Sequence, residues 1–263
     1  MSLFRFSGHS CETQLIGAID DWAKALDKSC HTDIAIFDFS KAFDSVPYRR
    51  LLYKLNAYGI RSVNLKWISS FLSNRHQRVV INGAQSSWLP VISGVPQGTV
   101  LGPLLFLLYI TDITKDISSD IRLFADDCIL YRVIRTQSDC ITLQADIDRL
   151  YSWATTWQMQ FNSSKCHILT ISHQRNPTLV SYYLGPDQLS SVDSYHYLGI
   201  TISSDLCWDK HVSAVSSKAT RYLSQVKSSQ VSFNKIQWQS HCIYRYTKIK
   251  TKVKIKNTMS NVH

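Results

Sequence analysis

The sequence predicts an α+β fold in which helices cover one face of an antiparallel sheet. Three observations support this prediction. The predicted elements follow the order β-α-ββ-α-β with helical insertions. Two of the strand pairs are hairpins, which are antiparallel. The helical segments have apolar residues at a spacing of three to four. With 44% hydrophobic and 18% charged residues in 263, the chain has the composition of a globular protein.

The first half of the chain is predicted to alternate helices with short strands. Leu15, Ile19, Trp22 and Leu26 recur at helical spacing. An Asn-Gly pair between two strand-like runs suits a type I′ turn. The predicted elements are a helix at 11–29 capped by Ser10, a strand at 33–39 containing Asp38, a helix with Ser45 as N-cap and Pro47 in its first turn that ends at Gly59, a helix at 62–73, and a hairpin turning at Asn82-Gly83.

The second half begins with a loop rich in glycine and proline, "SGVPQGTVLGP". An apolar helix, an acidic hairpin, an amphipathic helix and short strands are predicted after it. Their ranges are 93–103 for the loop, 104–113 for the helix, 121–133 for the hairpin, 137–158 for the second helix, 167–172, 179–184 and 195–202 for the strands, and a last helix from near Asp209.

Targeting signals are not evident in the sequence. The N-terminus has no sustained apolar core, and the longest apolar run, 100–110, is shorter than the ~20 residues that span a bilayer. Seven scattered cysteines without a C-x-x-C pair argue against a disulfide framework or zinc site and favour a reducing compartment. We therefore expect an intracellular protein, nuclear or cytoplasmic and not secreted, without a membrane partner.

The net charge of +10 is concentrated near the C-terminus. Residues 231–263 contain seven lysines or arginines and no acidic residue, so residues 1–230 have a net charge of only +3. Charge alone therefore gives weak support for a polyanion partner. The lysine-rich segment suits an edge strand or a polyanion contact, but the preferred interpretation is a frame-shifted or non-selected extension.

Two adjacent carboxylates, Asp126 and Asp127, interrupt the apolar run "RLFADDCILYR". An acidic hairpin turn explains them, and Asp38 alone could cap a helix. The other explanation is chemical, because Mg²⁺ prefers carboxylate oxygens and phosphoryl transfer uses two such ions about 4 Å apart. If the strands before Asp38 and around the pair are neighbours, the three carboxylates converge.

Five motifs occur in one order: "FDFSKAFDSV" (37–46), "SGVPQGTVLGPLLF" (93–106), "FADD" (124–127), "FNSSKCHILTIS" (161–172) and "YHYLGITISSDLCWDKH" (195–211). Over residues 8–225 the chain resembles reverse transcriptases of non-LTR (LINE-type) retrotransposons. The resemblance implies a right-hand polymerase palm, with partial fingers and an incomplete thumb. It also implies RNA-directed DNA synthesis with an RNA template, a DNA primer and dNTPs as partners, and two Mg²⁺ ions, or Mn²⁺, as cofactor.

The resemblance also implies a role for each matching residue. Asp38, Asp126 and Asp127 match the catalytic aspartates, with Asp38 and Asp126 as principal metal ligands and the backbone oxygen of Phe39 completing the shell. The other implied roles are dNTP contacts by Phe43, Gln97 and Gly98, protonation of pyrophosphate by Lys165, and a primer grip at Tyr197, Leu198 and Gly199. From the residues alone, Phe43 could be a core aromatic, the Gln-Gly loop a tight turn, and Lys165 a solvated lysine.

The predicted domains are a fingers–palm domain at 1–203 with incomplete fingers, the start of a thumb at 204–230, and a basic tail at 231–263. We expect a polymerase domain that is truncated at both ends. Two other functions stay open at this point. One is a non-catalytic RNA-binding remnant of a polymerase, and the other is a two-metal nuclease, which the aromatic residue after Asp38 and the Pro-Gln-Gly loop disfavour.

Overall fold

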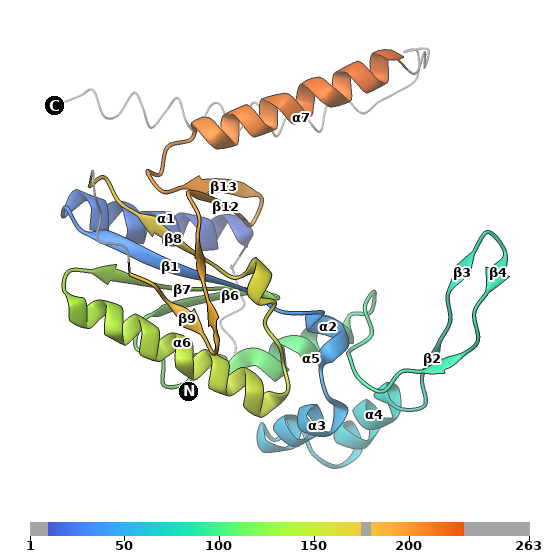
Figure 1. Ribbon diagram of the computed structural model, residues 1–263. Coiled ribbons are helices and arrows are strands. Elements are labelled where there is room, and N and C mark those ends of the chain that lie inside the picture. The colour runs from blue at the N-terminus through green and yellow to red at the C-terminus, as the bar shows by residue number, and fades with distance from the viewer. Residues whose placement is uncertain (1–9, 175–179, 229–263) are drawn as a thin grey trace. The chain divides into compact units, whose positions relative to one another are not determined.

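The computed structural model describes residues 10–174 and 180–228. The chain divides into two units, residues 1–211 and 212–263. Among the residues that the structure describes, the first unit contains every strand and all helices up to the start of the last one (Figure 1). Of the second unit, residues 212–228 are described, and they are helical. The predicted basic tail, 231–263, lies outside the described residues, as do the last two residues of the predicted thumb segment.

A five-stranded sheet forms the centre of the first unit. Its strand order is β11-β8-β1-β7-β6, and all neighbours are antiparallel except β11 and β8, which are parallel. The strands are β1 (His31–Asp38), β6 (Asp120–Phe124), β7 (Asp127–Ile134), β8 (His167–Ile171) and β11 (Ser190–Ser191). Four further pairs lie outside it: β2 (His76–Gln77) with β5 (Leu89–Pro90), β3 (Val80–Ile81) with β4 (Ala84–Gln85), β9 (Tyr183–Leu184) with β10 (Asp187–Gln188), and β12 (Ser194–Tyr197) with β13 (Ile200–Ser203).

The helices agree with the predicted positions to within a few residues. Local capping explains two of them, because Ser10 with Thr13 and Thr136 with Asp139 form capping boxes at α1 and α6. The helices are α1 (Cys11–Asp27), α2 (Ala42–Ser45), α3 (Tyr48–Ala57), α4 (Ser62–Leu72), α5 (Leu101–Ile110), α6 (Gln137–Trp157) and α7 (Asp209–Ser228), with 3₁₀ turns η1 (Thr111–Thr114) and η2 (Ser163–Lys165).

Helices cover both faces of the sheet, so the prediction of helices on one face was wrong. The reason is that β1 is buried along almost its whole length, and alternate residues enter two different clusters. Ala35 and Phe37 face the cluster that contains α5 and α6. Ile34 and Ile36 face the second cluster, in which Leu15, Ala18 and Trp22 of α1 cover the sheet.

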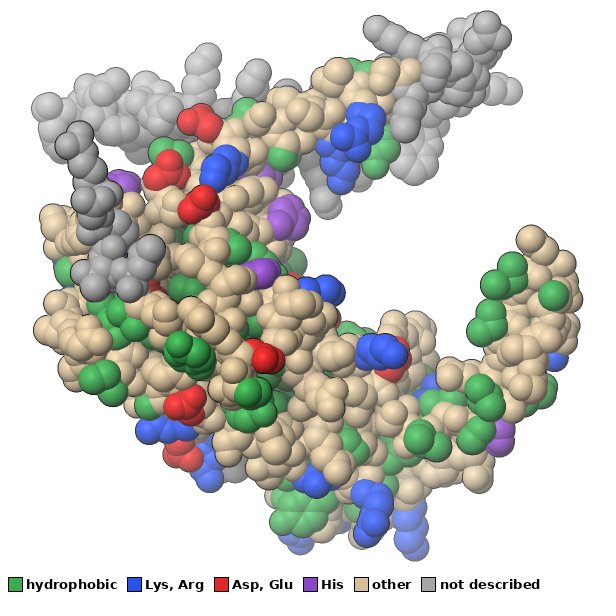
Figure 2. Space-filling view, in the orientation of Figure 1, with side chains coloured by type: hydrophobic (Ala, Val, Ile, Leu, Met, Phe, Trp, Pro, Cys, Tyr) green, Lys and Arg blue, Asp and Glu red, His purple; other side chains and the backbone are tan. Residues whose placement is uncertain are grey.

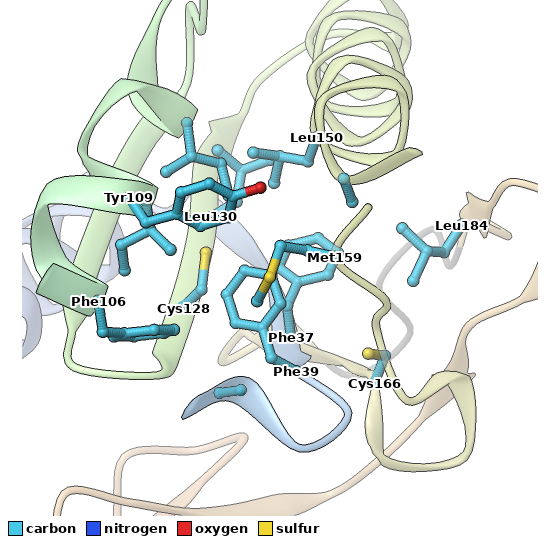
Figure 3. Close-up of a cluster of buried hydrophobic side chains, with 14 of the residues drawn as sticks. Phe37, Phe39, Phe106, Tyr109, Cys128, Leu130, Leu150, Met159, Cys166 and Leu184 are labelled. Atoms are coloured by element: carbon cyan, nitrogen blue, oxygen red, sulfur yellow. The ribbon is translucent and has the colours of Figure 1, made fainter. Parts of the chain in front are cut away.

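The first cluster is the larger of the two. Aromatic and sulfur-containing side chains meet here around the end of β1, as Figure 3 shows. The ring of Phe39 stacks on that of Phe161 with centroids 4.5 Å apart. This packing fixes the backbone immediately after Asp38, because Phe39 itself is almost fully buried. The labelled members are Phe37, Phe39, Phe106, Tyr109, Cys128, Leu130, Leu150, Met159, Cys166 and Leu184.

Several predicted boundaries need correction. Ser45 is not an N-cap but the last residue of α2, and Pro47 takes the N-cap position of α3 instead of the first turn. Helix α5 begins at Leu101 instead of 104, because the Thr99 hydroxyl accepts a hydrogen bond from the Gly102 N–H and so starts the helix earlier.

Two predicted strands also differ. The predicted strand 195–202 is a hairpin, β12–β13, because Leu198 and Gly199 both adopt positive φ and reverse the chain. The predicted strand 179–184 is reduced to β9, and residue 179 lies outside the described residues. In the part of the chain that the structure describes, no helix is long and apolar enough to cross a membrane.

Candidate active site

The end of β1 meets the start of β7. Asp38 and Asp127 are register partners across the two strands, and Asp126 belongs to the two-residue turn that joins β6 to β7. Residues directly opposite one another in an antiparallel pair have Cβ atoms about 5 Å apart and side chains on the same face. The fold therefore brings together residues that are almost ninety positions apart in the chain.

The face on which these side chains lie follows from the alternation of the strands. Even-numbered residues of β1 and odd-numbered residues of β7 enter the cluster covered by α1. Asp38 is an even-numbered residue of β1 and Asp127 an odd-numbered residue of β7, so both project toward that face at its open edge. The turn itself is unusual, because Ala125, which lacks the freedom of glycine, has φ of +52°.

The carboxylates repel one another. Desolvation raises the pKa of Asp127 above its usual value, and the charges of Asp126 and Asp38 raise it further, although the side chain is exposed to solvent. A site that concentrates negative charge in this way favours a bound cation, because a cation removes the repulsion.

The backbone of Phe39 is oriented toward the same place. Phe39 forms an isolated antiparallel bridge with Phe161, and the flanking hydrogen bonds run from the Asn162 N–H to the Asp38 carbonyl and from the Ser40 N–H to the Gln160 carbonyl. In such a pair, the N–H and C=O of the bridged residue point away from its partner. The Phe39 carbonyl therefore faces the side of β7, where the acidic turn lies.

The ammonium group of Lys165 lies 3.3 Å from a carboxylate oxygen of Asp38. The lysine is at the end of η2 and is largely exposed, so the pair adds little to stability. The buried Cys166 follows it, and its sulfur accepts a hydrogen bond from the Asp38 N–H at 3.5 Å. Lys165 is thus largely solvated and lies beside the Asp38 carboxylate.

The donor set fits a hard divalent cation. Among the residues that the structure describes, no three His, Cys, Asp or Glu side chains surround one point as a complete metal site. Mg²⁺ does not require that, since it is usually held by one or two carboxylates together with waters and substrate phosphates. The facing carboxylates of Asp38 and Asp127, with Asp126 beside them and the Phe39 carbonyl, match this pattern.

The loop before α5 is attached to α2, immediately after β1. The Val95 N–H donates to the Phe43 carbonyl at 2.8 Å, and the Gln97 side-chain amide donates to Asp44 at 3.2 Å. Gly94 explains how close the two segments come, because a Cβ there would lie 2.7 Å from backbone atoms of Asp44. Gly98 has φ of +77°, but its missing Cβ would meet nothing within 4 Å.

The ring of Phe43 stacks on Phe106 of α5, with centroids 4.5 Å apart. It is half-buried against the first cluster. One side of the Phe43 ring therefore packs in the core, as one interpretation predicted. The other part of the ring is exposed, and a substrate could contact it.

The hairpin β12–β13 joins the same face of the sheet as the carboxylates. Tyr197 is buried in the second cluster and accepts a hydrogen bond from the Gln14 side chain at 3.0 Å. Leu198 and Gly199 form its turn. Burial raises the pKa of Tyr195, and the charges of Asp127 and Asp38 raise it further, which places this phenol within the field of the carboxylates.

Tyr195 and Gly94 are two residues that sequence reasoning missed. The motifs that contain them were identified, but their contacts depend on which segments the fold brings together. Gly94 has positive φ and lies close to Asp44. The only signal for this in the sequence is the glycine content of the loop.

Comparison with known proteins decides the family. Residues 4–202 match the family described as "Reverse transcriptase (RNA-dependent DNA polymerase)". The chain belongs to the reverse transcriptase family. Members of this family are RNA-directed DNA polymerases, a class of nucleotidyltransferase, and they generally use divalent metal ions.

Relatives from mobile elements agree with this assignment. The chain is 29% identical over 220 residues to the RNA-directed DNA polymerase from mobile element jockey of Drosophila melanogaster, covering 79% of this chain and 23% of that protein. It is 29% identical over 215 residues to the probable RNA-directed DNA polymerase from transposon X-element of the same organism, covering 80% and 24%. The predicted non-LTR reverse transcriptase resemblance is confirmed. The reverse transcriptase chain spans about a quarter of the length of these relatives.

Solved structures agree at the level of the fold. A telomerase from Candida tropicalis in complex with a TWJ fragment of telomeric RNA matches with a TM-score of 0.52 at 14% identity, over 75% of this chain and 33% of that one. An apo telomerase from the same organism, truncated from its C-terminal domain, matches with a TM-score of 0.50 at 14% identity, over 75% and 39%. These likenesses confirm the predicted α+β polymerase palm.

Proposed function

We propose that this reverse transcriptase domain catalyses RNA-templated DNA synthesis at the carboxylates between β1 and β7. One observation carries the proposal: Asp38 and Asp127 are register partners, with Asp126 in the adjoining turn. Asp38, Asp126, Asp127 and the Phe39 carbonyl would hold two Mg²⁺ ions, or Mn²⁺. When bound, these ions lower the pKa of the attacking hydroxyl and stabilise the charge that develops on the leaving phosphate.

The reaction would join a primer strand to a dNTP. The primer 3′-hydroxyl would give up its proton to solvent as its oxygen attacks the α-phosphorus, a new P–O bond would form, and the bond to the bridging oxygen of pyrophosphate would break. Lys165 would donate the proton that pyrophosphate takes up, and its position beside Asp38 supports this role. The hairpin turn at Leu198 and Gly199, anchored by buried Tyr197, would support the primer end.

Phe43 would select the sugar of the incoming nucleotide. Its ring is fixed by stacking on Phe106, so it could not move aside easily for a 2′-hydroxyl. Gln97 and Gly98 would contact the nucleotide from the adjoining loop, which is attached to Asp44. Substitution Phe43→Val should therefore raise the use of rNTPs relative to dNTPs.

Primer extension on an RNA template with dNTPs and Mg²⁺ tests the proposal. The key variant is Asp126→Asn, and Asp120→Asn at the far end of β6 is the matched control. Extension that disappears in the first variant and persists in the second supports the polymerase. RNA binding without extension in the wild type supports a non-catalytic remnant, and template shortening supports a nuclease. A separate Mg²⁺-dependent rise in melting temperature tests metal binding without turnover.

A further inference from the structure

The segment between the first catalytic strand and α5 has a one-sided charge. From Ser45 to Thr111 the chain contains seven lysines or arginines and no aspartate or glutamate. This is the reverse of the catalytic edge, where carboxylates gather. The first unit thus separates its charges along the chain, although residues 1–230 as a whole are only mildly basic. The seven are Arg49, Arg50, Lys54, Arg61, Lys66, Arg75 and Arg78.

Six of these cations have no carboxylate partner among the described residues, although Arg50 and Arg75 are half-buried and hydrogen-bonded to protein oxygens. Lys54 is buried and paired with Asp112. In the residues that the structure describes, none of the other six lies within salt-bridge distance of a carboxylate. Arg49, Arg61, Lys66 and Arg78 are exposed.

Large apolar side chains are exposed in the same segment. Residues 76–90 form the two short strand pairs that we call the arm (Figure 1). Every one of these residues is exposed to solvent. Figure 2 shows apolar side chains along it. The indole of Trp88 is 58% exposed, and the ring of Trp67 on α4 is 59% exposed. The function proposed above uses none of these residues.

Arg78 and Trp88 form a composite surface on the arm. The Arg78 guanidinium lies over the Trp88 ring, 4.6 Å from its centroid, and donates a hydrogen bond to Gln85 at 2.5 Å. The guanidinium and the indole are therefore held together before any ligand arrives. Because the guanidinium covers one face of the indole, a nucleobase would stack on the other face and a phosphate would bind the guanidinium.

We propose that the arm is a binding surface for single-stranded RNA, with Arg78 and Trp88 at its centre. The absence of acidic residues favours a polyanion over a protein partner of mixed charge, and the exposed indoles favour unpaired bases over a duplex. The inference deepens the proposed function, since a template must be held as a single strand before it is copied. It does not depend on catalysis.

Binding of the full chain to a fluorescent single-stranded RNA, measured by anisotropy at several salt concentrations, tests the inference. Trp88→Ala should weaken binding about tenfold or more, and Trp88→Phe should retain most of it. Arg78→Ala should also weaken binding and reduce the slope of log K against log salt by about 0.7, whereas Arg78→Lys should keep the slope. Lys24→Ala, an exposed cation on α1, is the control and should change binding less than twofold.

Three results would overturn the inference. One is equal affinity of the wild type and Trp88→Ala. Another is a loss of affinity for double-stranded RNA on Trp88→Ala that equals the loss for single-stranded RNA. The third is a dimer, measured by light scattering, that Trp88→Ala dissociates, because the arm would then be an interface between two copies of the chain. Measuring RNA binding in a chain that also carries Asp126→Asn separates this inference from the proposed catalysis. Binding that still depends on Trp88 supports RNA binding by the arm even if extension is never observed.

Discussion

Neutralising Asp127, one of the proposed catalytic carboxylates, should stabilise the fold. Asp127 faces Asp38 across the β1–β7 pair, and its pKa is raised first by desolvation and then by the charges of Asp126 and Asp38. Charge pairs directly opposite one another in a sheet change the free energy of unfolding by about 0.2 to 1 kcal/mol, and like charges lower it. Solvent screens the exposed Asp127, so the repulsion here stays within that range. We therefore expect Asp127→Asn to increase the free energy of unfolding by about 0.5 to 1 kcal/mol at pH 7 without Mg²⁺. For a chain of this size, that is about 1 to 4 °C in melting temperature.

The pH dependence of this gain has a definite sign. Because the pKa of Asp127 is raised in the folded protein, the folded state binds the proton more tightly than the unfolded state does. The cost of ionisation is therefore present above the folded pKa and vanishes below the ordinary value of about 3.9. The advantage of Asp127→Asn should be complete at pH 7 and should disappear as the pH falls through the raised pKa.

Urea unfolding followed by circular dichroism at pH 7 and at about pH 4 measures both effects. Asp187→Asn, an exposed change in β10, is the control and should stay within about 0.5 kcal/mol of the wild type at pH 7. Adding Mg²⁺ should stabilise the wild type more than Asp127→Asn. A variant that is less stable than the wild type at pH 7, or a gain that is the same at both pH values, would refute the repulsion argument.

Two further predictions concern packing. Lys54→Ala should lower the free energy of unfolding, measured in urea, by about 2 to 4 kcal/mol. The substitution leaves Asp112 without its 2.5 Å partner and empties the space beside the Trp157 ring. A loss below about 1 kcal/mol would contradict this reasoning. Gly94→Ala should cost about 2 kcal/mol or more, since its Cβ would meet the Asp44 backbone at 2.7 Å. Gly98→Ala should cost only the strain of positive φ, about 1 kcal/mol, and equal losses would contradict the contact argument.

The sequence was most informative where local rules apply. The helix start at Ser10 and the turn at Asn82-Gly83 follow from capping and turn chemistry, and both are as predicted. The position of Asp126 in a hairpin turn was also predicted. The contact between Asp38 and Asp127 needed the motif resemblance, because nothing local to either residue indicates which strand will be its neighbour.

The errors have a common physical origin in tertiary contacts. One-sided coverage of the sheet was predicted from the order of strands and helices, which does not assign a helix to a face, whereas Trp22 of α1 covers the second face. The range 195–202 was predicted as one strand, although the resemblance also implied a hairpin at 197–200, and the turn requires positive φ at Leu198, which leucine rarely adopts. There, burial of Tyr197 and the freedom of Gly199 outweigh the preference of leucine.

The distribution of charge follows from what the two regions would bind. A carboxylate near a phosphate backbone repels it, so acidic residues are tolerated only where a cation lies between them and the nucleic acid. Asp38 and Asp44 are the last acidic residues before the basic segment, and Asp112, after α5, is the next one. Asp112 is itself neutralised by Lys54. The acidic edge therefore suits metal ions and the arm suits RNA, and a charge-reversing Arg78→Glu should weaken RNA binding more than Arg78→Ala, while Lys24→Glu should have much less effect.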